Sequence, residues 1–252
     1  MGFEYIGVDD AIGRGGLRMV VLGDVPSPWG EAAKGFFHIK KLDWAAVRLV
    51  YDNENLARWA GQLSGPVVVY DSEPPRSGWE EILGLAERLA PAPALLPADA
   101  VQRGRALALA KAFCSESGLG WIRRLQLVHA GLQKTGGFSE RVAGYLGKKY
   151  GYDPAQAANY GPRVRELLGA MNAALRASGD DYYLGTLSAV DVYSATFMAL
   201  FAPLPEAHCA MHPGARAAFE WLDPETRAAL DPRLLEHRDM MYARHLALPL
   251  SL

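Results

Sequence analysis

The chain has 252 residues, of which half are hydrophobic and about a fifth charged, and its formal net charge is −2. This composition is typical of a globular protein of one or two domains with a substantial core. The nearly balanced charge produces no field suited to nucleic acid or to an anionic membrane, and no apolar run reaches the roughly 18 residues that a membrane-spanning helix needs. We therefore expect neither a nucleic-acid nor a membrane partner.

Residues 1–16 end in a glycine-rich stretch, and we interpret them as an extension that lies on the surface. Their acidic beginning lacks the charged and then apolar layout of a secretory signal. The two cysteines, Cys114 and Cys209, lie in otherwise helical, apolar surroundings. Two isolated cysteines make no disulfide framework, so a reducing cytoplasm is the simplest interpretation.

Strand and helix signals alternate between residues 17 and 90, which we predict to form a first domain. Short β-branched runs predict strands, and proline and glycine mark the turns between them. The predicted elements are a strand at 20–22, a turn at 23–27, a helix at 30–41, a strand at 44–51, a short helix or loop at 54–63, a strand from 66 to 70, and a helix at 79–89.

Residues 91–98 are rich in proline, which stops the preceding helix and stiffens a linker. The apolar spacing after this linker is helical throughout, so we predict an all-helical domain over residues 99–252. Its predicted helices cover 100–132, 139–150, 162–178, 188–201, 213–221 and 230–247. Gly118 and Gly120 favour a bend or a close approach within the first of these helices.

Three short motifs stand out. Ser27 precedes Pro28, which suits the first turn of a helix, so Ser27 lies where helical N–H groups without partners converge. Pro66 stands at the first residue of a strand, where proline is tolerated and a cis bond is possible. Ser188 and Asp191 have the spacing of a capping box, and the helix that follows is apolar almost all round, which predicts a buried spine.

These motifs, in this order, resemble those of the glutathione transferase superfamily. Leu22-Gly-Asp-Val-Pro-Ser-Pro-Trp29 is similar to the Leu-Gly-x-x-x-Ser-Pro-Phe turn of its serine-type, Tau-like branch. Gly65-Pro66-Val67 is similar to its cis-proline turn, and the Ser188–Asp191 pair to its helical capping box. The resemblance spans about residues 17–202. It implies a thioredoxin-like α/β domain followed by an all-α domain.

The resemblance also implies a chemistry, the addition of a glutathione thiolate to an electrophile. A hydroxyl that donates to sulfur at a helix N-terminus favours the thiolate, so Ser27 would be the catalytic donor. Gly65, Pro66 and Val67 would bind the tripeptide through the main chain, as in a short antiparallel ladder. Two simpler interpretations stay open: Ser27 merely caps the helix, and Gly65-Pro66 is an ordinary trans turn.

One position departs from the family pattern. Enzymes of the superfamily carry an acidic residue and then serine at the start of the next helix, where this chain has Arg76-Ser77. Ser77 can cap that helix and offer its N–H to a carboxylate. Arg76 has no acceptor for the glutathione amine but can grip a carboxylate. Either another acid takes the amine, with Asp71 and Glu73 nearest in sequence, or the preferred ligand is not ordinary glutathione.

The electrophile would lie between the two domains, against aromatic side chains that suit an apolar pocket. The candidate walls are Trp29, Phe113, Trp121 and Tyr242, although the same residue types at helical spacing also form cores. We thus predict a cytoplasmic glutathione transferase-like enzyme that adds glutathione to, or removes it from, a small hydrophobic substrate. The alternative is a protein of the same fold that binds a ligand or protein without turnover. The resemblance further implies a homodimer.

Other functional classes lack their motifs. Residues 13–16 are too short for a phosphate loop and precede a strand. His208 and His212 are the only histidines near a cysteine at close spacing, and we expect no metal site. The Pro-Ser-Pro-Trp turn at 26–29 stands where a thioredoxin relative holds Cys-x-x-Cys, which excludes dithiol chemistry there. A serine hydrolase would need a Gly-x-Ser-x-Gly elbow, which Ser27 does not have.

Overall fold

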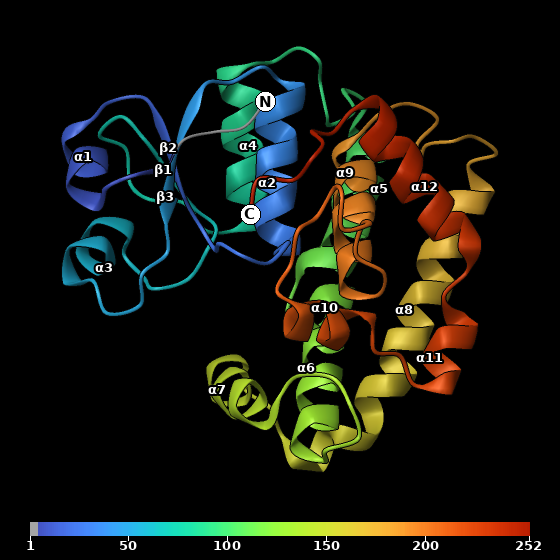
Figure 1. Cartoon of the computed structure of the whole chain (residues 1–252). Coiled ribbons are helices and arrows are strands. Elements are labelled where there is room, and N and C mark those ends of the chain that lie inside the picture. Colours follow the sequence, from blue (N-terminus) through green and yellow to red (C-terminus); the bar gives the residue numbers. More distant parts are fainter. Residues whose placement is uncertain (1–4) are drawn as a thin grey trace.

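The protein is described here as a computed structural model that covers residues 5–252 (Figure 1). All four strands precede residue 71 in this part of the chain, and every element after residue 99 is helical. The first group of elements is β1 (Tyr5–Ile6), α1 (Val8–Gly13), β2 (Leu17–Val21), α2 (Pro28–Ile39), β3 (Trp44–Arg48), α3 (Glu54–Ala60), β4 (Val67–Tyr70) and α4 (Trp79–Leu89). The predicted combination of an α/β part and an all-helical part is confirmed.

The second group contains the remaining helices, with two short 3₁₀ turns at Pro154–Gln156 and Met198–Leu200. These helices are α5 (Ala100–Cys114), α6 (Leu119–Leu132), α7 (Glu140–Tyr150), α8 (Ala157–Ala177), α9 (Ala189–Phe197), α10 (Pro213–Glu220), α11 (Pro224–Ala229) and α12 (Pro232–Arg244). None of the helices described between residues 5 and 252 is long and apolar enough to cross a membrane.

The four strands form one mixed sheet in the order β1-β3-β2-β4. β3 runs parallel to both β1 and β2, and β4 runs antiparallel to β2 with Val67 opposite Val20. Side chains alternate across this sheet as the strand period requires. Met19 and Val21 face a core shared with α2 and α4, whereas Val20 belongs to a second core with α3. Figure 1 shows α2 and α4 on one face and α1 and α3 on the other.

Residues 5–16 lie largely at the surface, but they also add a strand to the sheet and a short helix to its face. Tyr5 and Ile6 pair with Ala46 and Val47, and Ala11 in α1 is fully buried against the second core. A two-residue strand is too short to produce a recognisable sequence period, which is why the pattern did not reveal it. Residues 1–4 of the predicted extension lie outside the described part. The domain limits 17–90, 91–98 and 99–252 stay a prediction.

Several predicted helices differ from the structure at their ends. The long helix expected over 100–132 is two helices, because the chain leaves the helical conformation at Ser115 and begins again after Gly118. The helix expected from Pro162 begins at Ala157, so the proline lies inside α8. The final helix expected over 230–247 is present as α12, which begins after its N-cap Asp231 and ends at Arg244. The short helix α11, capped by Asp223, precedes it and was not predicted.

Helix α9 occupies the centre of the molecule, as Figure 1 shows. All nine of its residues are buried, which confirms the predicted buried spine. It contacts α2 of the first part and α5 and α12 of the second. The face of α2 that covers the sheet and the helical half are therefore packed into one continuous core.

Candidate functional site

The turn at the end of β2 places Ser27 at the N-cap of α2. Its N–H donates to the Val25 carbonyl at 2.9 Å, and its carbonyl accepts from the Glu31 N–H at 2.8 Å. Its half-buried hydroxyl makes no capping bond and no other hydrogen bond with residues 5–252. The interpretation of Ser27 as a side-chain cap is therefore wrong, and the hydroxyl is available to a ligand at the positive end of the helix.

The second predicted element lies beside this turn. The Gly65-Pro66 bond is cis, so the alternative of an ordinary trans turn is wrong. A Cβ at Gly65 would lie 3.4 Å from the Leu22 nitrogen and from the Val20 oxygen. Gly65 thus packs closely against the end of β2, directly before the Ser27 turn. Val67, the first residue of β4, is fully buried and pairs with Val20, so the half-buried Gly65 is the part of this turn that a ligand can reach.

A small hollow joins the beginnings of α2 and α4. Trp29, Pro66, Ser77 and Trp79 line it, together with Tyr193 of α9. Tyr193 donates its hydroxyl to the Trp79 carbonyl at 3.1 Å, and their ring centroids are 5.9 Å apart in an edge-to-face arrangement. The fold thus brings together the start of α2, the cis-proline turn and the start of α4, where the sequence analysis placed Ser27, Gly65-Pro66 and Arg76-Ser77.

Ser77 does not cap α4, contrary to the sequence prediction. The N-cap is Gly78, whose N–H donates to the Glu81 carboxylate at 3.0 Å. Glu81 provides this bond because it stands three residues after the cap, where a carboxylate reaches back to the cap N–H. Ser77 is exposed and lines the hollow one residue earlier.

Arg76 is held by internal partners. It forms an antiparallel bridge with Val68, and its guanidinium donates to the Glu73 carboxylate at 2.6 Å. Arg88 binds the same carboxylate, and its hydrogen bonds, followed by those of Arg76, lower the pKa of Glu73. Asp71 accepts from the Gly16 N–H at 2.7 Å. Both acids that the sequence suggested as amine ligands are therefore already engaged.

The four predicted aromatic walls do not lie together. Phe113 is fully buried and packs edge-on against Phe197 at 5.8 Å between centroids, so it is core. Trp29 also packs against Phe197, at 4.9 Å, and donates its indole N–H to the Cys114 carbonyl. Trp121 is linked to Trp29 by Arg124, whose guanidinium lies over both rings.

Tyr242 lies on the other side of α2. It lines a cavity of about 650 Å³ with Glu31, Lys34 and His38 and with the C-terminal segment 246–251. At about 100° per helical residue, this cavity faces the side of α2 opposite Trp29. The structure therefore separates Tyr242 from the predicted electrophile pocket. Burial raises the pKa of Glu31, which lies 2.7 Å from the Lys34 ammonium.

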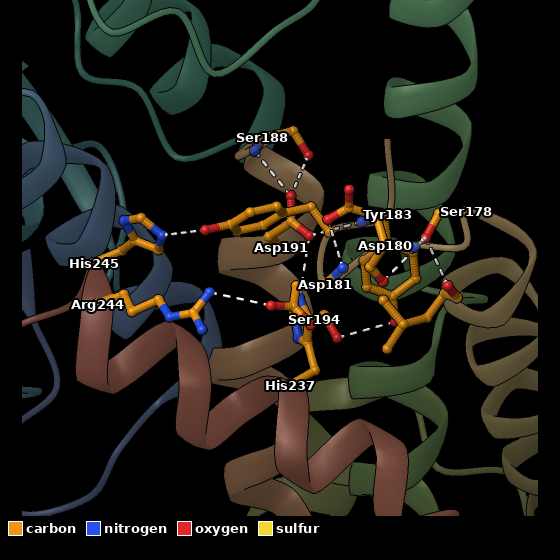
Figure 2. A network of polar contacts seen from close by, with 12 residues as sticks. Ser178, Asp180, Asp181, Tyr183, Ser188, Asp191, Ser194, His237, Arg244 and His245 are labelled. Atoms are coloured by element: carbon orange, nitrogen blue, oxygen red, sulfur yellow. Dashed lines mark hydrogen bonds and ion pairs between the residues drawn. The ribbon is translucent and has the colours of Figure 1, made fainter. Parts of the chain in front are cut away.

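The Ser188–Asp191 pair forms the predicted cap and extends into a larger network (Figure 2). Ser188 donates its N–H at 2.8 Å and its hydroxyl at 2.6 Å to one carboxylate oxygen of Asp191. The other oxygen accepts from the Tyr183 N–H at 3.0 Å and lies 3.1 Å from His237 Nε2. Asp191 is completely buried, so this network joins α9, the loop before it and α12 without access to solvent.

Sequence reasoning missed Arg124 and Tyr150. The guanidinium carbon of Arg124 lies 4.1 Å from the Tyr150 ring centroid and 4.6 Å from that of Trp29. The only sequence signal is that Arg124 follows Trp121 by three residues and so shares its helix face. Tyr150 comes from another helix. Within residues 5–252, no group of His, Cys, Asp or Glu side chains could hold a metal ion, and both cysteines are free and buried.

No protein-family model and no curated protein matches the sequence. Solved structures do match over most of the chain. A glutathione S-transferase from Methylobacterium radiotolerans, in complex with glutathione sulfonate, is 19% identical, with 90% of this chain and 91% of that chain covered and a TM-score of 0.59. One from Methylobacillus flagellatus, with glutathione bound, is 12% identical, with 90% and 95% covered and a TM-score of 0.63.

A glutathione transferase from Pseudomonas putida, with one glutathione disulfide bound per subunit, is also similar. The identity is 14%, 92% of this chain and 96% of that chain are covered, and the TM-score is 0.57. The chain therefore has the glutathione transferase fold, with a thioredoxin-like part followed by a helical part.

Proposed function

We propose that this protein binds glutathione beside Ser27 and adds the glutathione thiolate to, or removes glutathione from, a small apolar electrophile. The observation that carries the proposal is the Ser27 hydroxyl at the start of α2, which has no hydrogen-bonding partner among residues 5–252 and lies next to the Gly65-Pro66 turn. A free thiol has a pKa of about 8.5 and is mostly protonated near neutrality. A hydroxyl donor and a helix N-terminus both favour the thiolate.

The remaining contacts follow from the same geometry. The main chain of Gly65, at the cis-Pro66 turn that leads into Val67, would pair with the cysteine of the tripeptide, and the N–H of Ser77 would receive a carboxylate. Trp29 and Trp121 would form the wall for the electrophile. The structural neighbours named above hold glutathione, its sulfonate or its disulfide, which supports glutathione as the ligand. The homodimer and the cytoplasmic location stay predictions.

Glutathione is expected to raise the melting temperature of the purified protein. A ligand that binds only the folded state adds about 2.7 kcal/mol of stability at 100 times its dissociation constant. Differential scanning fluorimetry across millimolar glutathione measures this effect, with S-methylglutathione to show that the thiol is not required. An unchanged melting curve would favour the alternative of a fold relative that binds a different ligand without turnover.

Replacing Arg76 tests the departure from the family pattern. Arg76→Glu supplies an acceptor for the γ-glutamyl amine near Ser77, and we expect the Kd of glutathione to fall about threefold, as for one partly exposed charge contact. Arg88→Glu is the matched control, because Arg88 binds the same Glu73 carboxylate from the last turn of α4. Calorimetry compares the three proteins. Weaker binding in Arg76→Glu would show that Arg76 already serves a glutathione carboxylate.

A further inference from the structure

Arg124 occupies an aromatic enclosure at the junction of the two halves of the molecule. Its guanidinium carbon lies 4.1 Å from the ring centroid of Tyr150, 4.6 Å from that of Trp29 and 5.9 Å from that of Trp121. The three rings come from α7, α2 and α6. Trp29 follows Ser27 by two residues, so Arg124 borders the proposed site on its helical side.

The guanidinium has no hydrogen-bonding partner and no acid partner among residues 5–252. Its neighbour Arg123 is a direct contrast, because Arg123 donates to the carbonyls of Leu200 and Trp221 and to the Gln126 side chain. A guanidinium has five N–H donors, and stacking on rings compensates for lost hydration without satisfying those donors. Arg124 is thus the member of this pair whose donors remain for a ligand.

A second cation lies nearby, again without an acid. Lys149 of α7 places its ammonium 5.1 Å from the Tyr51 ring centroid and 5.6 Å from that of Tyr150, and donates to the Leu63 carbonyl. Burial and the neighbouring Tyr145 and Tyr150 phenols raise the pKa of Tyr51 to about 12, so the Tyr51 phenol is neutral at physiological pH. No described group at this place supplies the opposing negative charge.

This cluster is open to solvent. Tyr51 is 44% exposed and Tyr145 is 49% exposed, with their rings edge-to-face at 6.0 Å, and Arg124 itself is half-buried. The three rings around Arg124 are half-buried. Half-buried aromatic rings beside an unpaired guanidinium suit a planar ligand that carries a carboxylate, because the rings offer stacking faces and the guanidinium offers a fork of parallel donors.

We propose that the electrophile of this protein is an aromatic carboxylate, whose carboxylate is held by Arg124 and whose ring lies against Trp29 or Tyr150. The proposal rests on the proposed function for its reaction but extends it from an apolar substrate to an anionic one. It assigns Arg124 as a specificity-determining residue. The negative charge would also be stabilised by Lys149, as a second cation of the same cluster.

Binding without glutathione tests the proposal apart from any turnover. The probes are para-nitrobenzoate and para-nitrobenzamide, which have nearly the same shape but differ by one negative charge. Isothermal calorimetry on the wild-type protein is expected to show about tenfold tighter binding of the carboxylate, as a charge-assisted pair predicts. Arg124→Met should remove most of this preference and leave the smaller share that Lys149 provides, and Arg124→Lys should keep more of it.

Arg105→Met is the control variant, because Arg105 is exposed on α5 and its loss should leave the ratio unchanged. Circular dichroism of each variant shows whether the fold is retained, and Arg124→Lys provides a readout if Arg124→Met does not fold. Equal binding of the two probes by the wild type, or binding of neither, overturns the proposal. So does an unchanged ratio in Arg124→Met with weaker glutathione binding, which would assign Arg124 to a glutathione carboxylate.

Discussion

Asp191→Ala is expected to lower the free energy of unfolding by about 3–5 kcal/mol, the cost of removing one partner from a buried polar network. The carboxylate accepts two bonds from Ser188 and one from the Tyr183 N–H, and it lies beside His237. All of these groups would lose their acceptor where water cannot reach. His237 Nδ1 is already buried without a hydrogen-bonding partner in the described structure, so the ring would then have no hydrogen bond at either nitrogen.

Asp99→Ala is the matched control for this substitution. Asp99 is also a helix cap, accepting from the Gln102 N–H, but it is exposed, and its loss should cost only about 1 kcal/mol. Urea denaturation of the two variants measures both costs. The soluble fraction of Asp191→Ala should keep near-normal specific activity, because the network lies away from the Ser27 turn. Lost activity with an unchanged denaturation midpoint would contradict the structural role.

Ser27→Ala is expected to lower kcat by about one to two orders of magnitude, since one donor to a developing charge is worth a few kcal/mol. The substitution should leave the melting temperature nearly unchanged, because the Ser27 hydroxyl makes no capping bond. It should also move the pH–rate profile of the bound thiol to higher pH, since the thiolate loses a donor. Turnover of chlorodinitrobenzene between pH 6 and 9, roughly the range over which thiols ionise, records both effects.

Ser139→Ala is the corresponding control. Ser139 is the N-cap of α7 and, like Ser27, makes no side-chain capping bond, but it does not line the hollow beside the Ser27 turn. It should behave as the wild type in both kcat and the pH profile. If Ser27→Ala also retains full turnover, another hydroxyl serves the sulfur and the assignment of Ser27 is wrong.

The local signals of the sequence were sufficient where short-range chemistry decides the structure. Pro28 and Ser27 mark the start of α2, and the Ser188–Asp191 spacing marks the start of α9. The predicted bend near Gly118 is a complete break between α5 and α6. A Cβ at Gly118 would lie only 2.8 Å from the Ala112 carbonyl oxygen. Glycine therefore permits the close return of the chain between α5 and α6.

Tertiary packing decided the features that the sequence could not reveal. Tyr242 and Trp29 are both aromatic residues that the sequence suggested for one pocket. The structure places them on different sides of α2, because the whole fold decides along which face of α2 the C-terminal segment runs. The same holds for Arg124, whose aromatic neighbours come from three helices. Helix α8 begins at Ala157, five residues before the start that Pro162 predicts. In this first part of the helix the Tyr160 hydroxyl accepts from the Asp153 N–H, a tertiary contact that the sequence pattern does not show.

The position of α9 has a consequence for how the protein loses its structure. Helix α9 shares one core with α2 of the thioredoxin-like part and with α5 and α12 of the helical part. Melting either part alone would expose the apolar faces that the other part covers, so partial unfolding carries most of the cost of complete unfolding. The two parts should therefore unfold together in a single cooperative calorimetric transition, despite their different architectures.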